Sequence, residues 1–140
     1  MQTVLNRFQS LLGQKARYQF RVSSSMIWRE NSEVTFINLL STSALFESFH
    51  RAGQELLEKI LDKGMTSAIV SSQIDHLAVT PAGMQVTLQV EVVGVENNHI
   101  FFTGEAFDET EKIAVAQFER VVVGLDFLKR KALEKARFIF

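Results

Sequence analysis

The stretch Ser43–Lys63, SALFESFHRAGQELLEKILDK, decides the fold of this chain. Its apolar residues recur every three or four positions and so form one broad stripe, made of Leu45, Phe46, Phe49, Ala52, Gly53, Leu56, Leu57 and Ile60. A hydroxyl side chain from Ser41, Thr42 or Ser43 can cap the start of a helix here. Gly64 can end it. The pattern predicts one amphipathic helix of about five turns.

Segments on both sides of this helix alternate apolar and polar residues, which is typical of half-buried strands. We expect strands over Ala16–Ser23, Ser67–Ala78, Met84–Val92, Ile100–Phe107 and Ile113–Leu125, and a closing helix over Asp126–Arg137. Met1–Leu12 reads as a small helix or an ordered arm. One long helix cannot bury its stripe alone, so an antiparallel sheet must curl around it in an α+β fold. This order fits a hotdog fold, and also cystatin-like and other helix-on-sheet folds.

Composition narrows the function mainly by exclusion. The chain has 140 residues, enough for the single domain that we expect over 1–140, and its formal net charge of −1 offers no basic face for nucleic acid. No cysteine is present, which excludes disulfides, thiolate metal sites and a cysteine nucleophile. The three histidines are scattered and form no metal-ligand pattern. No apolar run approaches the ~18 residues of a membrane span and no signal peptide is evident, so we expect a cytoplasmic protein.

Three segments resemble a known family. The segment Ile74–Met84, IDHLAVTPAGM, resembles the pattern His, apolar, Ala, any, Thr-Pro, any, Gly of hotdog thioesterases of the fluoroacetyl-CoA thioesterase-like family. The segment Leu40–Leu45, LSTSAL, matches the start of that family's long helix, and Gln117–Val123, QFERVVV, matches its last strand. The resemblance implies a hotdog fold, with an antiparallel sheet wrapped around one long central helix plus a C-terminal helix. It also implies a homodimer that acts on acyl-CoA.

The resemblance implies a site of three side chains, a Thr before the long helix, a Glu within it and a His before the Thr-Pro turn. The Thr falls on Thr42 and the His on His76, but the Glu position falls on His50. Glu47, nearly one turn earlier, is a possible supporting carboxylate. Further departures are Ile69 in place of a glycine and Ala116–Phe118 in place of Gly-Thr-His, and they concern the catalytic site rather than the fold.

The chemistry open to these residues follows from their types. Thr42 caps the helix, orients a water or acts as a nucleophile, and the helix start itself favours an oxyanion. His76 is the best candidate base, because an ordinary histidine titrates near pH ~6.5. His50 is a second base, a donor to the thioester carbonyl or a mere boundary residue. Thr42 and His50 lie about 12 Å apart by helical rise, so they cannot touch directly.

Further residues near the expected site have less certain roles in the sequence pattern than Thr42, His50 and His76, or roles outside the site. Trp28, Phe36 and Leu39 lie on an apolar connection, where they form a lid or acyl-pocket wall or simply pack on the helix. His99 falls in an expected turn and is predicted to be exposed. Asp75 faces away from His76 on a regular strand. Glu119 and Arg120 are predicted to be solvated or interface charges.

The favoured function is hydrolysis of a small or medium acyl-CoA at a site in a homodimer interface, through Thr42, His50 and His76. No metal, no cofactor other than the CoA of the substrate, no nucleic acid and no membrane are expected. Two alternatives stay open. The missing carboxylate suggests a non-catalytic acyl-CoA or lipid-binding hotdog protein, and a hydratase or dehydratase on the same fold would use Glu47 as its carboxylate.

Overall fold

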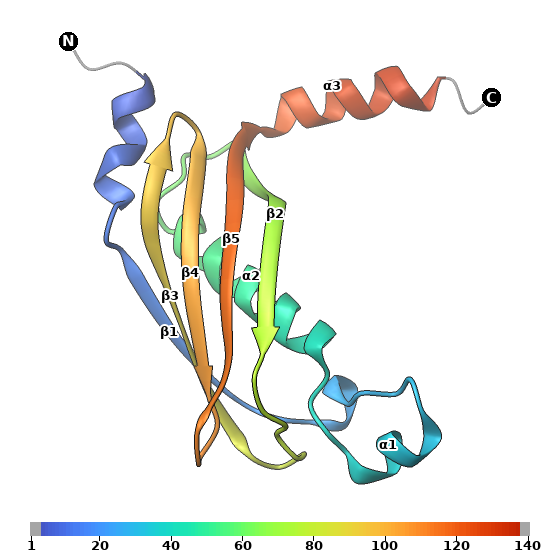
Figure 1. Cartoon of the computed structure of the whole chain (residues 1–140). Coiled ribbons are helices and arrows are strands. Elements are labelled where there is room, and N and C mark those ends of the chain that lie inside the picture. The colour runs from blue at the N-terminus through green and yellow to red at the C-terminus, as the bar shows by residue number, and fades with distance from the viewer. Residues whose placement is uncertain (1–3, 138–140) are drawn as a thin grey trace.

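The computed structural model describes residues 4–137 as a sheet laid against one long helix (Figure 1). Met1–Thr3, within the segment read as a small helix or arm, lie outside the described residues. In chain order the elements are η1 (Val4–Leu11), β1 (Lys15–Arg21), η2 (Ser24–Met26), α1 (Ser32–Ile37), α2 (Thr42–Glu58), β2 (Met65–His76), β3 (Gln85–Glu96), β4 (His99–Phe107), β5 (Lys112–Gly124) and α3 (Leu125–Ala136). Most predicted strands and the closing helix begin and end close to the predicted positions, whereas α2 and β3 end elsewhere and the short helices α1 and η2 were not predicted.

The five strands form a single antiparallel sheet in the order β1-β3-β4-β5-β2. The strand that follows α2 in the chain, β2, therefore lies at one edge of the sheet, beside the last strand. Figure 1 shows the sheet curving across α2, with β2 and β5 on one side and β1 on the other. The predicted α+β architecture, an antiparallel sheet around one helix, is confirmed.

The contact between α2 and the sheet depends on two glycines. The buried stripe of the helix consists of Leu45, Phe49, Ala52, Gly53, Leu56 and Leu57. A Cβ atom placed on Gly53 would lie 2.8 Å from the Phe118 ring, and one on Gly104 of β4 would lie 2.6 Å from the Phe49 ring. Because neither position has room for a side chain, helix and sheet approach closely enough for the aromatic rings to fill the space between them.

The long helix ends earlier than its apolar pattern predicted. The prediction ran to Lys63, whereas α2 ends at Glu58 and Ile60 is exposed. The chain has to reverse before β2 begins at Met65, and Gly64 takes a φ of 89° in that reversal. The turn therefore uses the residues that would have formed the last helical turn.

The hairpin between β3 and β4 also differs from the prediction. His99 was expected in a turn, but β3 continues to Glu96, and in the hairpin Asn97 alone takes a positive φ. The register shifts between Val92 and Gly94, so the extra residue, Val93, forms a bulge. His99 consequently begins β4 instead of lying in a loop.

The last helix, α3, stands apart from this packing. It follows β5 directly, has no buried residue and projects away from the sheet past β2 (Figure 1). Among residues 4–137, no helix combines the length and apolar character needed to cross a bilayer.

Candidate active site

The start of α2 lies against the end of β2, and a hydroxyl and an imidazole meet there. Ser41 is the residue that caps the helix, because its Oγ accepts a hydrogen bond of 3.0 Å from the Ala44 N–H. The hydroxyl of Thr42 is thereby free to turn toward β2. Its Oγ1 lies 2.8 Å from Nδ1 of His76. The structure thus brings together two of the three predicted site residues, which are 34 positions apart in the sequence.

The environment of His76 favours a neutral imidazole. The side chain is half-buried, and burial lowers the pKa of His76 below its ordinary value, an effect opposed in part by the backbone of Ala78. Its Nε2 is buried and has no hydrogen-bond partner within residues 4–137. A neutral ring has one nitrogen able to accept a proton, so Nδ1 can accept from Thr42 while Nε2 carries the hydrogen.

A pocket of about 410 Å³ opens beside this pair. Its lining comes from the connection before α2, the start of α2 and the chain after β2: Trp28, Glu30, Leu39–Ser43 and His76–Val79. Two of the three predicted pocket-wall residues, Trp28 and Leu39, are in that lining. Phe36 is outside it, and 86% of this residue is exposed. Six of the eleven lining residues are apolar and can contact a small acyl chain, and the polar ones gather at the start of α2, at His76 and at Glu30.

His50 lies on the same face of α2 but forms a different pair. Its Nε2 lies 2.6 Å from the hydroxyl oxygen of Ser72 on β2, and its ring packs between Phe46 and Phe118. Burial, and secondly the charge of Arg120, lower the pKa of His50. Sequence reasoning missed Ser72, although alternation from His76 does place residue 72 on the inner face of β2.

Arg120 is the charged group that links the three elements around His50. One of its terminal nitrogens donates 2.7 Å to the backbone carbonyl of His50, and the other donates to the carbonyl (3.2 Å) and hydroxyl (3.1 Å) of Ser67. The residue is 4% exposed, so the prediction of a solvated or interface charge is wrong for a single chain. Burial lowers the pKa of Arg120, and Glu58 opposes this shift. The physical reason is the inward alternation of β5, which continues through this position.

The pairs Thr42–His76 and His50–Ser72 both connect α2 to β2, at different heights along the two elements. Thr42 and His50 are about 12 Å apart along the helix, and Ser72 and His76 are about 13 Å apart along the strand. His50 is not in the lining of the pocket. Within one chain, therefore, the three predicted residues form one contacting pair and one separate histidine.

The supporting carboxylate predicted at Glu47 has a different partner. Glu47 Oε1 accepts 2.8 Å from Arg51, one turn further along α2, and both side chains are mostly exposed. His99, predicted to be exposed, is half-buried and pairs instead with Glu119 on the neighbouring strand β5. These two carboxylates are therefore occupied by partners away from the pocket. Within residues 4–137, no cluster of three or more His, Asp or Glu side chains is placed to hold a metal ion.

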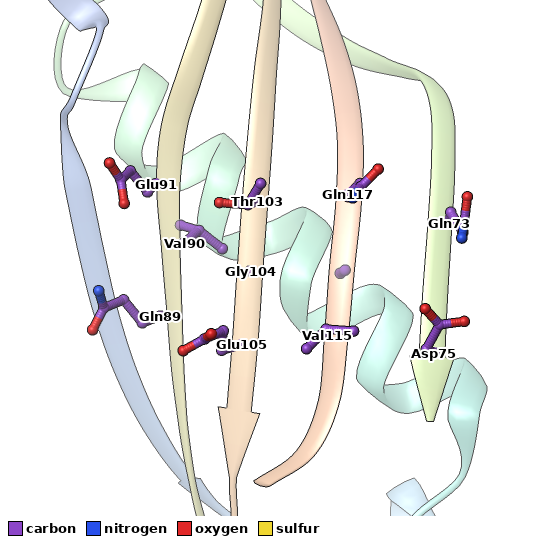
Figure 2. A pocket seen from close by; sticks show the side chains of 11 residues that line it. Gln73, Asp75, Gln89, Val90, Glu91, Thr103, Gly104, Glu105, Val115 and Gln117 are labelled. Atoms are coloured by element: carbon purple, nitrogen blue, oxygen red, sulfur yellow. The ribbon is translucent and has the colours of Figure 1, made fainter. Parts of the chain in front are cut away.

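A second cavity, of about 340 Å³, lies on the opposite face of the sheet (Figure 2). Figure 2 shows carboxylate and amide side chains standing along it, among them Gln73, Asp75, Glu91, Glu105 and Gln117. Asp75 thus faces away from His76, as predicted. The lining has carboxylates but no lysine or arginine, so this face offers no counter-charge for the phosphates of a CoA thioester.

An antiparallel sheet around one long helix, with a hydroxyl and an imidazole at the start of that helix, defines a hotdog-fold protein of the thioesterase class. Residues 22–126 match the model of the family described as fluoroacetyl-CoA-specific thioesterase, FlK. The match covers more than half of the chain, which therefore belongs to this family of thioester hydrolases. The family predicted from the sequence is confirmed.

Solved structures agree on the fold. A hot-dog-like protein from Thermanaerovibrio acidaminovorans is 30% identical, with a TM-score of 0.86 over 91% of this chain and 96% of the other. A thioesterase superfamily member from Thermus thermophilus is 22% identical, with a TM-score of 0.79 over 90% and 95%. The fluoroacetyl-CoA thioesterase FlK is 23% identical, with a TM-score of 0.80 over 89% and 96%. The search of curated proteins gave no match.

Proposed function

We propose that the protein hydrolyses the thioester of a small or medium acyl-CoA, with Thr42 and His76 as the reacting pair. The observation that carries this proposal is the 2.8 Å contact between the Thr42 hydroxyl and Nδ1 of His76 beside a pocket of about 410 Å³. The substrate class is supported by solved complexes of related proteins. FlK mutants have been crystallised with fluoroacetate and CoA and with acetyl-CoA.

The reaction follows from the geometry of the pair. Nδ1 of neutral His76 accepts the proton of Thr42 as its oxygen attacks the thioester carbonyl, and the oxyanion forms near the positive end of α2. The CoA sulfur then leaves with the proton held by His76. Water, deprotonated by the same ring, hydrolyses the acyl-threonine ester. If Thr42 orients water instead, no acyl-enzyme forms, and mass spectrometry after rapid quenching distinguishes the two routes.

We also propose that the site is completed in a homodimer. β2 is an edge strand of twelve residues, and within the described part of the chain only β5 pairs with it, so its outer row of backbone groups can pair with another strand. A second copy that pairs antiparallel on this edge, about a two-fold axis, would cover it in both chains at once. His50 and Ser72 lie along this edge, so His50 acts at the interface, where the family has a carboxylate. A cytoplasmic location stays a prediction from the sequence.

A panel of acyl-CoA substrates of increasing chain length, monitored for release of free thiol, tests the function. Wild-type protein should hydrolyse short or medium chains, whereas His76→Ala should lose most of the activity. Unchanged activity in His76→Ala would overturn the assignment.

Enoyl-CoA hydration, followed on the same samples, tests the hydratase alternative. Binding of CoA esters without turnover would favour the non-catalytic alternative. Light scattering measures the oligomeric state.

A further inference from the structure

Two groups of exposed apolar side chains lie at opposite ends of β2. The first, the α3 patch, consists of Leu125, Phe127, Leu128 and Leu133. The second, the rim patch, borders the pocket and consists of Phe36, Ile37, Leu77 and Val79. Each of these eight residues is at least 39% exposed. Grouped apolar side chains of this kind are typical of a contact surface.

The residues of the rim patch come from two segments that are hydrogen-bonded to each other. The backbone N–H of Ala82 donates to the carbonyl of Asn38, and that of Leu40 donates to the carbonyl of Thr80, each at 2.8 Å. These bonds hold the end of α1 beside the chain that leaves β2. Leu77 and Val79 line the pocket, and Phe36 and Ile37 lie at the other end of the paired segments, beyond Asn38 and Ala82.

The α3 patch belongs to a helix that no other residue of the described range 4–137 buries. The helix has twelve residues and no buried one, and isolated helices of this length are marginal in water. Its first N–H donates 2.8 Å to the carbonyl of Gly64, next to the start of β2. Its charged residues are four basic and two acidic: Lys129, Arg130, Lys131 and Lys135 against Asp126 and Glu134. A covering surface is needed to keep it helical.

The register of the sheet decides which surface α3 can reach in a dimer. Gly124, just before α3, pairs with Met65 at one end of β2, and Ala114 pairs with His76 at the other end. Two copies joined antiparallel along β2 would place the Met65 end of one beside the His76 end of the other. Strands lie about 4.8 Å apart and α3 is about 18 Å long. Because α3 already projects past β2 (Figure 1), it can cross to the rim patch of the second copy.

We propose that α3 of each chain docks on the rim patch of a second copy and there supplies Lys129, Arg130 and Lys131 to the phosphate groups of CoA. This inference rests on the proposed acyl-CoA function. A single two-fold axis brings the α3 patch of each chain onto the rim patch of the other. The lining of the pocket contains a carboxylate, Glu30, and no lysine or arginine, so the cations for a polyanionic substrate have to come from outside it.

Cross-linking tests the docking without any assay of activity. The chain has no cysteine, so Leu133→Cys on one copy and Val79→Cys on another introduce single thiols. The two variants, co-expressed with different tags and treated with a short bis-maleimide, should form a cross-linked pair identified by peptide mass spectrometry. Val93→Cys, exposed on the bulge of β3, replaces Val79→Cys in the control and should not cross-link. Equal cross-linking in both mixtures, or in neither, would refute the docking.

Calorimetric titration with CoA tests the phosphate contacts. The double variant Lys129→Gln/Lys131→Gln should bind CoA about tenfold more weakly, because two charge-assisted contacts are lost. The control Lys15→Gln/Arg17→Gln removes the same charge from β1, at the far edge of the sheet, and should bind CoA like the wild type. Equal CoA affinity in all three proteins would overturn this half of the inference. Absence of thioester hydrolysis in the wild type would instead count against the proposed function, because neither experiment depends on turnover.

Discussion

Ser41 and Thr42 are adjacent hydroxyl residues with different partners. Ser41 accepts the 3.0 Å capping bond from Ala44, and Thr42 lies 2.8 Å from His76. One hydroxyl therefore holds the helix and the other faces the imidazole. The cap on Ser41 removes the simplest structural explanation for Thr42, because Thr42 is not needed to satisfy the start of α2.

Substitutions at these two positions should affect different properties, activity at Thr42 and stability at Ser41. Thr42→Val keeps the shape of the side chain but removes the hydroxyl, so kcat should fall at least ~100-fold while the melting temperature changes little. Thr42→Ser should retain activity. Ser41→Ala should lower the free energy of unfolding by about 1 kcal/mol through loss of the cap. Steady-state kinetics and thermal melts on the three variants check this, and a Thr42→Val protein as active as the wild type would contradict it.

The pH dependence of hydrolysis should follow the neutral form of His76. Burial lowers the pKa of His76, so the base is ready at a lower pH than an ordinary histidine, and kcat should rise with pH to a plateau with its midpoint below about 6.5. A pH–rate profile from pH 4.5 to 8.5 measures this. A midpoint above that of a free histidine would show that a nearby negative charge, not burial, dominates around His76.

Folding stability should depend on both inner histidines. The pKa values of His50 and His76 are lower in the folded chain than in the unfolded one, so the unfolded chain binds more protons as the pH falls. The stability that the two histidines contribute is thus fully present above the ordinary histidine pKa. It is lost as the pH falls through their pKa values in the folded chain. Urea unfolding at pH 5 and 7.5 should show a smaller loss in His50→Gln/His76→Gln than in the wild type. An identical loss of unfolding free energy in both proteins would show that these histidines do not cause the pH dependence of stability.

Ser72 should matter through the orientation of His50. Ser72→Ala removes the 2.6 Å contact, so we expect kcat to fall severalfold with KM nearly unchanged, a smaller effect than at Thr42. The matched control is Ser71→Ala, one residue earlier on the exposed outer face of the same strand, which should behave like the wild type. If Ser72→Ala and Ser71→Ala are indistinguishable, the His50–Ser72 pair plays no part in turnover.

Gly104 should not tolerate a side chain. A Cβ atom there would lie 2.6 Å from the Phe49 ring in the centre of the core, so Gly104→Ala should destabilise the fold by about 1–3 kcal/mol. Gly124→Ala provides the control, because no atom lies within 4 Å of the added carbon and its φ is −76°. Chemical denaturation compares the two, and equal stability would mean that the core relaxes around the added methyl group.

Local pattern was enough to find the five strands, the long helix and the closing helix, but not the short helices α1 and η2. Alternation located β1 to β5 and three- to four-residue spacing located α2, because each period reports which side of a single segment is buried. The same logic misplaced the end of α2 and treated Arg120 as exposed. Both errors arise from parts of the chain outside the segment itself. The helix ends early because the chain reverses into β2, and Arg120 is buried because it binds the carbonyl of His50.

The site likewise has a part that the sequence predicted and a part that only the folded chain shows. Thr42 and His76 were identified by resemblance of short motifs, each read from its own stretch of chain. Their contact across 34 positions, the exposure of Phe36 and the pairing of His50 with Ser72 were set by the tertiary structure. The sequence by itself determined where the five strands and the long helix lie, since the periods that mark them depend on local backbone geometry. Only the packing of α2 against β2 decided which inward side chains meet, because it depends on where two distant segments come to lie.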